Sequence, residues 1–318
     1  SQVFRDHVPS RTARAVTLLE AEGAVLVGKA NQHEFAWGTT SQNAYFGDVV
    51  NPVDRLKVSG GSSGGNAAAL AAGLCTIGLG TDTGGSVRIP SACCGTVGFK
   101  PSFGEVPTDG VFGLASSLDT VGPMARSVAD CALLYEILTS RKVEEIDLSG
   151  VRIGVIEPTG IEAMLEAAGA SLVDFAFPSY ADDLSLLYYA ECAKTHEQLY
   201  PLRKSDYSED VQAKLDRARQ ITAGEYSRAH GALREFRERV HDALSVDALI
   251  GPVLGAPVPE VGCWEPDVRE GLGRYTRAYN YLGWAAVAIG DLQVGGPVST
   301  EVLGMALSME RLLSGEGT

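Results

Sequence analysis

The 318-residue sequence has few cysteines, and their spacing excludes the common metal and redox motifs. Its six cysteines form no C-x-x-C pair and no Cys/His ligand spacing, so neither a zinc site nor a thioredoxin-like motif is indicated. We therefore expect reduced thiols in a cytoplasmic protein. No apolar run approaches the roughly 20 residues that cross a bilayer. Nothing at the N-terminus, which begins with Ser1, has the pattern of a signal peptide, so we expect no membrane association.

Positive charge is also scarce. The sequence holds 26 Lys and Arg against 40 Asp and Glu, a formal net charge of −14. A chain with this balance lacks the overall attraction for phosphate groups that nucleic acids and acidic membranes require. We expect neither as a partner. Hydrophobic residues make up 45% of the sequence, which at this length supports a large core.

Two glycine-flanked serines stand in the stretch 57–101, which reads KVSGGSSGGNAAALAAGLCTIGLGTDTGGSVRIPSACCGTVGFKP. Ser62 precedes an alanine-rich segment that predicts a helix, and Gly73 is a natural helix end. The apolar segment 74–79 predicts a short buried strand. Ser86 follows that strand within TDTGGS, where glycines let the backbone turn tightly and bring N–H groups close to a ligand. Chemistry is therefore expected at this end of the strand.

Strands and helices alternate along much of the remaining sequence. The apolar run 24–27 predicts a strand that ends at Gly28 and Lys29, whereas the glycine-dotted stretch 106–123 predicts irregular structure. Further strands are predicted at 151–156, 172–175, 246–250 and 285–289, and helices at 127–138, 161–168, much of 184–244 and 302–313. This alternation predicts an α/β fold with a mixed, mostly parallel central sheet covered by helices on both faces. Ligands of such sheets bind beyond the carboxyl ends of the strands.

Two familiar motifs fit this sequence poorly. Residues 60–64 match the G-x-S-x-G elbow of α/β-hydrolases, but the residues before them carry Pro52 and charges instead of a strand. The candidate partner histidines His196, His230 and His241 all lie in charged helical sequence. Residues 80–85 resemble a phosphate loop, yet Ser86 stands where its lysine belongs. On spacing alone, Lys29 is equally well interpreted as a surface lysine and the glycines as turn formers.

Several motifs in a fixed order change that interpretation. They are VGKANQHEFAWG at 27–38, GGSSGG at 60–65, GTDTGGSVRIP at 80–90, CGTVGFKP at 94–101 and SSLDTVGPMARSVAD at 116–130. Together they closely resemble the amidase signature family, clearly over 26–138 and more weakly to the C-terminus. The resemblance implies that 1–318 forms a single amidase domain, with a helical section at about 182–245 packed on the α/β core.

The resemblance implies a catalytic role for three residues. Ser86 is the implied nucleophile, Ser62 the bridging serine with a cis peptide bond, and Lys29 the terminal base. A serine hydroxyl is a poor nucleophile until a base accepts its proton, and a lysine accepts one only when it is neutral, which burial or nearby positive charge promotes. For His33 and Trp37, packing beside the lysine and contact with substrate both stay open.

The same resemblance implies a supporting set around the serines. The oxyanion hole would consist of the backbone N–H groups of four consecutive residues, Thr83, Gly84, Gly85 and Ser86, which would stabilise the charge that develops on a carbonyl oxygen. The supporting side chains would be Ser63 and an ion pair between Asp82 and Arg88.

The sequence also departs from the family at two places. Only 28 residues precede Lys29, so the family's N-terminal strand segment is expected to be missing. The segment that follows Trp284, AAVAIGDLQVGG, is shorter than the family's strand, glycine loop and strand. Both departures weaken any prediction of the substrate.

These observations predict an amidohydrolase that acts on linear amides, not on peptide bonds. It would convert a small carboxamide, urea-like or carbamoyl compound to an acid plus ammonia or an amine through an acyl-enzyme on Ser86, without metal or organic cofactor. One alternative is the glutamine-hydrolysing A subunit of a tRNA-dependent amidotransferase, although the section 184–244 does not closely resemble that protein. A second alternative is a noncatalytic binding protein on the same scaffold. A homodimer is the family-level expectation.

Overall fold

The computed structural model describes residues 1–180 and 184–315, and a central sheet organises this part of the chain. Its strands are β1 (Ile77–Asp82), β2 (Val97–Lys100), β3 (Thr120–Ala125), β4 (Arg152–Val155), β5 (Ser171–Asp174), β6 (Ala248–Pro252), β7 (Ala285–Ile289) and β8 (Leu292–Gly296). Across the sheet they stand in the order β1-β3-β2-β7-β8-β6-β4-β5. β1, the strand that leads to Ser86, is thus at one edge.

Helices surround the sheet and extend beyond it. The α-helices are α1 (Arg14–Ala21), α2 (Gly64–Ala71), α3 (Arg88–Cys94), α4 (Val128–Thr139), α5 (Glu162–Ala167), α6 (Leu184–Thr195), α7 (Tyr200–Arg203), α8 (Glu209–Ala218), α9 (Ala223–Ala243), α10 (Glu265–Leu272), α11 (Arg277–Leu282) and α12 (Ser299–Ser314). Short 3₁₀ turns lie at η1 (Gln2–Phe4), η2 (Glu34–Ala36) and η3 (Lys204–Asp206). None of the helices in the described ranges is long and apolar enough to cross a membrane.

The sheet is mixed, as predicted, but most of its pairings are antiparallel. Only β4 is parallel to its neighbours, β5 and β6, whereas every other described pairing is antiparallel. The prediction of a mostly parallel sheet is therefore wrong. Alternation of helices and strands does not specify which strands become neighbours. In addition, β7 and β8 are joined by the two residues Gly290 and Asp291, and so short a turn requires antiparallel strands.

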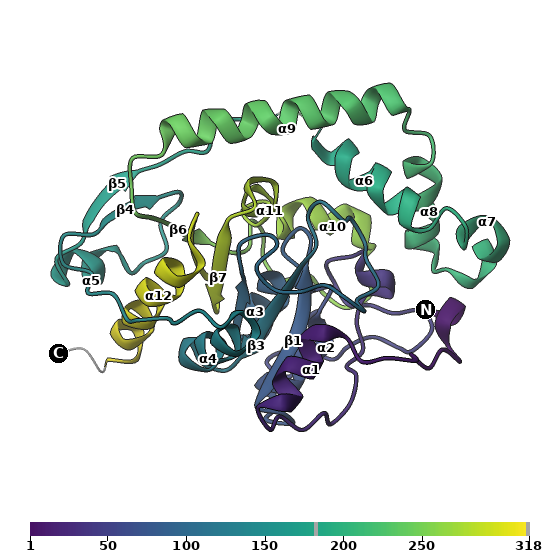
Figure 1. Cartoon of the computed structure of the whole chain (residues 1–318), viewed down its shortest axis with the longest axis horizontal. Helices are drawn as coiled ribbons and strands as arrows, with labels where there is room; N and C mark the ends of the chain where they lie inside the picture. The colour runs from purple at the N-terminus through teal and green to yellow at the C-terminus, as the bar shows by residue number, and fades with distance from the viewer. Residues whose placement is uncertain (181–183, 316–318) are drawn as a thin grey trace.

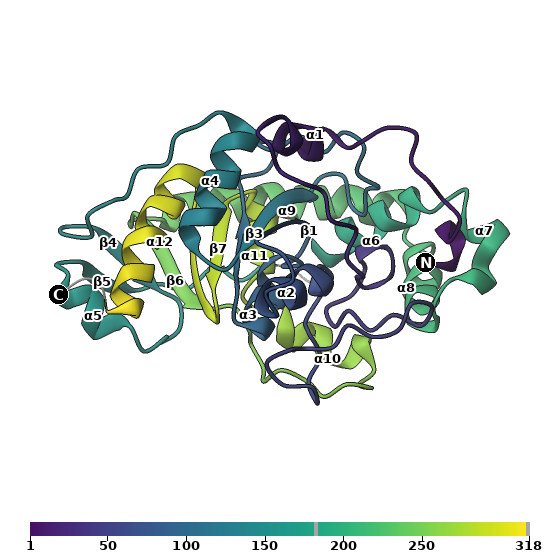
Figure 2. The same ribbon diagram turned by 90° about the horizontal axis from the view of Figure 1, so that it is seen from below.

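Helices cover both faces of the sheet, as the sequence predicts. Consecutive side chains of β3 point to opposite faces, and they belong to different cores. Ala125 packs with residues of α4 and α12, whereas Met124 packs with residues of α2 and α3. Figure 2 shows α4 and α12 lying along the strands. The loops that carry the two serines are consequently on the face covered by α2 and α3.

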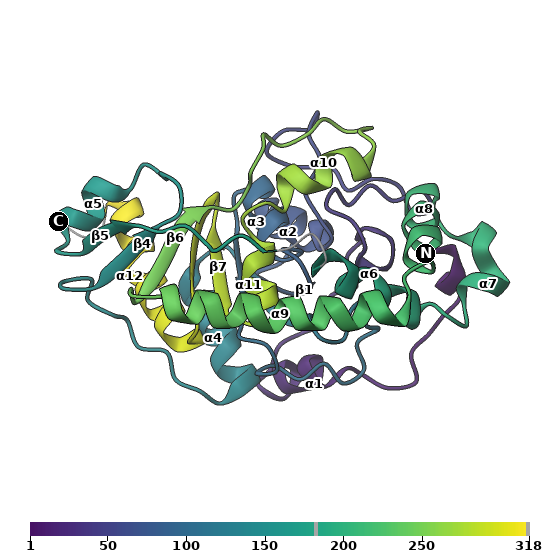
Figure 3. The same ribbon diagram turned by 90° about the horizontal axis from the view of Figure 1, so that it is seen from above.

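The section predicted to be helical contains α6 to α9, apart from residues 182 and 183, which lie outside the described residues. Figures 1 and 3 show α9 running along the molecule, from α8 at one end towards β4 and β5 at the other. Its buried residues Ala229, Leu233, Phe236 and Val240 recur at helical spacing and form one apolar stripe. The Arg and Glu residues between them are exposed, so the charges of α9 belong to a solvated face.

Two other predictions fail near the edge of the sheet. Residues 24–27 form no strand, and Val25 and Val27 are 82% and 80% exposed. The stretch 106–123 is not irregular throughout, because Thr120–Pro123 belong to β3. β3 is the second strand from one edge of the sheet and lies between β1 and β2. The glycine and proline in this stretch indicated irregular structure, but they belong to β3, which pairs with a strand on each side.

Two adjacent leucines of α4 differ in burial, which makes the packing of this helix testable. Leu134 of α4 is 2% exposed and packs against Leu19 and Val121, whereas the adjacent Leu133 is 57% exposed. We expect Leu134→Ala to lower the free energy of unfolding by about 2–5 kcal/mol because it leaves a cavity. Leu133→Ala should change it little. Urea unfolding of both variants measures the difference, and equal effects would contradict the packing of α4.

Candidate active site

Ser62 lies in a tight turn that leads directly into α2. The Gly61–Ser62 peptide bond is cis, and the Ser62 side chain is fully buried. Its hydroxyl has no hydrogen-bond partner among the described residues. The glycines of the turn allow close contact with a neighbouring segment, because a Cβ on Gly65 would lie 2.1 Å from the Asn31 carbonyl oxygen. The polar Ser62 side chain is thus buried without a bond that would account for it structurally.

Ser86 stands after β1, next to the Ser62 turn. The N–H of Ser63 donates to the carbonyl oxygen of Ser86 at 3.1 Å. The Ser63 hydroxyl also bonds to the backbone of Thr81 in β1, donating to its carbonyl oxygen at 3.4 Å and accepting from its N–H at 3.3 Å. Ser63 therefore links the two serine loops and the strand between them.

Ser86 is 9% exposed and opens into a small cleft with a volume of about 60 Å³. The cleft separates the Ser86 loop from α6, α10 and α11. Its walls combine aromatic rings, two guanidinium groups and one carboxylate, contributed by Ala36, Gly38, Thr39, Thr83, Gly84, Ser86, Leu118, Ser185, Tyr188, Tyr189, Arg269, Glu270, Arg277, Asn280 and Tyr281. A small polar molecule at the Ser86 hydroxyl would be surrounded by groups from both parts of the fold.

The backbone around Ser86 has N–H groups without a described acceptor in residues that line this cleft. Among the described residues no acceptor is found for the N–H groups of Thr83, Gly84 and Ser86. The N–H of Gly85, in contrast, donates to the Asp82 carboxylate at 2.7 Å. The Gly85 N–H is therefore already bonded in this conformation. Thr83, Gly84 and Ser86 remain as the predicted donors of the oxyanion hole. Gly85 has φ +123°, where side chains are rarely tolerated, so the turn requires a glycine here.

Asp82 and Arg88 form a fully buried ion pair beneath the loop. The Arg88 guanidinium donates to both oxygens of Asp82 at 3.0 Å. Its remaining bonds go to the Thr276 carbonyl oxygen and to the side chains of Gln293 and Asn280. Burial by itself would raise the pKa of Asp82, but the charge and hydrogen bonds of Arg88 lower it to about 2. This pair ties the Ser86 loop to α11 and β8.

Asp119 is a buried acid that the sequence reasoning did not single out, although it lies in the motif SSLDTVGP. It accepts from the Thr83 hydroxyl at 2.6 Å and from the N–H groups of Leu114 and Ala115. Burial raises the pKa of Asp119 above its usual value, against these hydrogen bonds. Asp119 thereby orients Thr83 at the edge of the cleft. Its position in that motif was the available signal.

Lys29 is not brought to the serines in this structure. Its side chain is exposed, and no hydrogen bond joins it to the Ser62 hydroxyl within the described residues. The backbone just after it does approach, because the N–H of Gly65 donates to the Asn31 carbonyl oxygen and the N–H of His33 donates to that of Ser62. The backbone that follows Lys29 therefore lies beside the Ser62 turn, whereas the Lys29 amino group is in solvent.

The buried ion pair predicts a pH-dependent loss of stability. Arg88→Met leaves the Asp82 charge buried without its partner, so we expect it to lower the free energy of unfolding by about 3–5 kcal/mol near neutral pH. A lowered pKa contributes stability above the unfolded pKa of about 4, and this contribution is lost as the pH falls toward 2. The gap between wild type and variant, measured by urea unfolding, should therefore narrow as the pH is lowered through this range.

The control for this prediction is Lys194→Met, which removes the exposed pair of Lys194 with Glu197. Exposed pairs contribute little, so this variant should unfold like the wild type at every pH. A gap for Arg88→Met that stays constant down to about pH 2 would contradict the coupling of the two residues.

Comparison with known proteins identifies relatives over nearly the whole chain. The family model described as Amidase matches residues 1–313. The A subunit of glutamyl-tRNA(Gln) amidotransferase from Methanospirillum hungatei is 30% identical over 98% of this chain and 86% of its own length. The corresponding protein of a Synechococcus strain, which carries the same name, is 33% identical over 98% of this chain and 77% of its own.

Solved structures agree with the sequence relatives. A crystal structure of an amidase matches with a TM-score of 0.86 and 32% identity, covering 96% of this chain and 78% of the other. The A subunit of glutamyl-tRNA(Gln) amidotransferase from Thermotoga maritima matches with a TM-score of 0.83 and 28% identity over 98% and 79%. With the ordered motifs and the mixed sheet, these matches establish that the chain belongs to the amidase signature family, whose members are amidohydrolases acting on C–N bonds of amides.

Proposed function

We propose that this chain hydrolyses a carboxamide through an acyl-enzyme on Ser86. The observation that carries the proposal is the position of Ser86, at the cleft and between N–H groups that have no acceptor among the described residues. An oxygen anion in the cleft could accept from the N–H groups of Thr83, Gly84 and Ser86. Such donors lower the barrier to acyl transfer because they stabilise charge where it develops.

In the proposed reaction, the Ser86 hydroxyl attacks the amide carbon and its proton passes to Ser62. As the C–N bond breaks, the leaving amine takes a proton back from Ser62, and water then hydrolyses the ester on Ser86. The support for Ser62 is its burial and its hydroxyl, which is not bonded to any described residue. Ser63, Asp82 and Arg88 would hold the two loops in register.

Lys29 completes the proposed triad as the base behind Ser62. The support for this role is the path of the backbone, which runs from Lys29 directly to bonds with Gly65 and Ser62. The proposal requires the amino group of Lys29 to leave solvent and reach the Ser62 hydroxyl. There it would lose exposure to water, which favours the neutral form that accepts a proton.

For the substrate, we place glutamine first. The two sequence relatives named above are A subunits of amidotransferases, which supports the glutamine-hydrolysing alternative over a free-standing amidase. In that role, the chain would release ammonia for a partner subunit. A small free carboxamide is the second candidate, because a crystal structure described simply as an amidase is equally similar in identity. Both substrates present the same primary amide to Ser86.

The triad is tested by ammonia release from a panel of glutamine, small amides, ureas and carbamoyl compounds. We expect Ser86→Ala and Lys29→Ala each to reduce release at least ~10³-fold, because either change removes a member of one catalytic unit. The controls are Ser171→Ala, at an exposed residue of β5, and Lys57→Ala, at a partly exposed pair with Glu260, and both should stay active. Unchanged release from the Ser86 and Lys29 variants would show that other groups perform the chemistry.

The two substrate candidates separate in the same assay. If the chain serves an amidotransferase, it hydrolyses glutamine, and its kcat/KM for glutamine exceeds its kcat/KM for acetamide and other small amides. It should also copurify with partner subunits when isolated at its natural abundance. Turnover of small amides with no detectable turnover of glutamine would instead support the free-standing amidase. A lack of labelling by a serine-directed fluorophosphonate would favour the noncatalytic alternative.

A further inference from the structure

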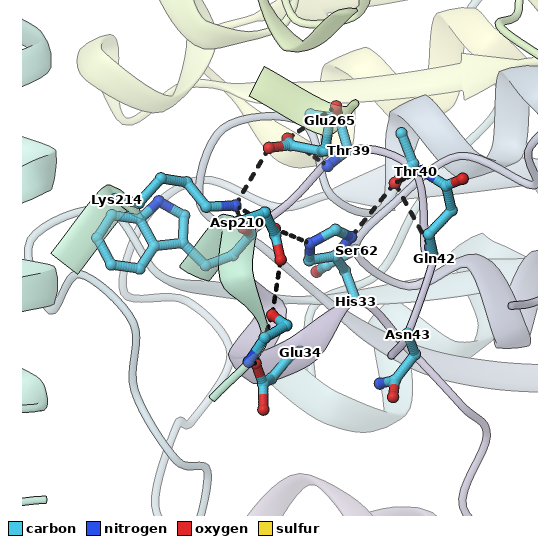
Figure 4. Close-up of polar contacts among 12 residues, drawn as sticks. His33, Glu34, Thr39, Thr40, Gln42, Asn43, Ser62, Asp210, Lys214 and Glu265 are labelled. Atoms are coloured by element: carbon cyan, nitrogen blue, oxygen red, sulfur yellow. Dashed lines mark hydrogen bonds and ion pairs between the residues drawn. The ribbon is translucent and has the colours of Figure 1, made fainter. Parts of the chain in front are cut away.

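A buried cluster of charges lies behind the Ser62 turn, outside the cleft. Lys214 of α8 is its centre, and its side chain is 4% exposed. The Lys214 amino group contacts Asp210 Oδ2 at 2.9 Å and Glu265 Oε2 at 3.1 Å, and it donates to the Trp37 carbonyl oxygen. Figure 4 shows Asp210 between Lys214 and His33. We call Asp210, Lys214 and Glu265 the Lys214 cluster.

The cluster holds one segment of backbone, residues 33–41, from several sides. Asp210 Oδ2 lies 2.8 Å from His33 Nε2. Glu265 Oε1 accepts from the N–H of Thr39 at 2.9 Å and from its hydroxyl at 3.1 Å. Together with the bond from Lys214 to the Trp37 carbonyl oxygen, these contacts hold the segment at its start, in its middle and near its end.

A second attachment joins the segment to the start of α8. Glu34 Oε2 accepts from the N–H of Ser208 at 2.7 Å and from its hydroxyl at 2.6 Å. The same hydroxyl oxygen lies 2.6 Å from Asp210 Oδ1. Helix α8 is therefore fixed to the segment at its first turn and again at Lys214.

The other side of the segment rests directly on the Ser62 turn. The carbonyl oxygen of Ser62 accepts from the N–H of His33 at 3.1 Å and from the Ser41 hydroxyl at 2.9 Å. A Cβ on Gly61 would lie 2.7 Å from the Gly38 carbonyl oxygen and 2.8 Å from the Thr40 nitrogen. No side chain separates the two backbones, so a displacement of the segment is transmitted to Ser62.

The backbone of the segment needs such external support. Phe35, Ala36 and Ser41 have φ of 52°, 58° and 56°, in the left-handed region. Residues other than glycine adopt this conformation at a cost of roughly 1 kcal/mol or more each, and it persists only where the surroundings determine it. The Lys214 cluster provides contacts of this kind.

Stability alone does not account for three charges in this place. Burial by itself would raise the pKa of Glu265, but Lys214 and Arg269 lower it to about 2. Burial likewise opposes ionisation of Asp210, but the hydrogen bond of His33 and the charge of Lys214 hold its pKa well below its usual range. Both acids are therefore ionised near neutral pH. Replacing buried ion pairs by apolar groups is often neutral for stability, so their value lies in the directed bonds they make.

We propose that Lys214 is a positioning residue for catalysis, which acts through Asp210, Glu265 and the segment 33–41 to hold Ser62 against Ser86. The inference rests on the proposed function for its effect on reaction rate. Lys214 touches neither the cleft nor the two serines, so it reaches Ser62 only through the segment 33–41. Because Ala36, Gly38 and Thr39 of this segment also line the cleft, a smaller effect on binding is expected beside the effect on Ser62. Misalignment of a proton-transfer group slows the chemical step more than it weakens binding.

The test is the rate of labelling of Ser86 by a fluorophosphonate, followed by mass spectrometry and separated into the binding constant KI and the chemical rate kinact. We expect Lys214→Met to lower kinact about 10–100-fold and to change KI by a smaller factor. Glu265→Gln keeps an acceptor for Thr39 but loses the charge that pairs with Lys214, so it should lower kinact by less. If Lys214→Met does not fold, Glu265→Gln carries the test.

Two controls separate positioning from stability. Leu165→Ala removes a buried side chain of α5 in the core on the other face of the sheet, and it should destabilise the fold without slowing labelling. Lys204→Met removes the exposed pair of Lys204 with Asp216 of α8 and should label like the wild type. Labelling of Lys214→Met at the wild-type rate, or equal slowing in Leu165→Ala, would overturn the proposal.

Hydrogen exchange of the same variants keeps this inference distinct from the assignment of the nucleophile. We compare Lys214→Met with Leu165→Ala under conditions in which both variants have the same free energy of unfolding. The N–H groups of His33 and Thr39 should then exchange faster in Lys214→Met. If the wild type is not labelled at Ser86 while exchange changes in this way, the nucleophile assignment fails and the positioning role is supported. Unchanged exchange at both groups would overturn the positioning role whatever the labelling shows.

Discussion

The buried ion pair between Asp82 and Arg88 is the interaction on which the candidate site depends. It joins the end of β1 to the first residue of α3, and Ser86 lies between them. Arg88 uses its other donors on α11, β8 and the residue before α11, so one guanidinium connects parts of the chain 188 to 205 residues apart. An unpaired charge at this depth is strongly unfavourable. Each of these parts is therefore held in one arrangement around the loop.

Close contact between backbones has the same effect at Ser62. The glycines around it leave no side chains between the turn and the segment 33–41, and α2 begins directly afterwards. The segment is held in turn by charged side chains of α8 and α10. Hence the helical section, which supplies walls of the cleft, is mechanically connected to the serine that would relay a proton. Substrate contact and catalytic alignment share the same supports.

The relatives and the site give complementary information about function. Membership of the family explains why the two serine loops occur in this order, and it assigns the reaction class. Part of the cleft wall comes from α6, α10 and α11, which lie outside the clearest motifs. Their tyrosines and arginines would contact the part of a substrate beyond the amide. In the proposed function, these residues would help to decide between glutamine and a small amide.

The sequence alone determined the local chemistry of this protein. The ordered motifs around Ser62 and Ser86 identified the family, because several motifs in a fixed order are specific and their glycines meet demands of backbone geometry that few other residues allow. Most helices, including α4 and the long α9, also followed from local patterns. Only the tertiary structure decided the direction of the strands, the exposed path of 24–29 and the partners Asp119, Asn280 and Lys214. These depend on contacts between residues far apart in the chain, and no local pattern encodes which distant groups become neighbours.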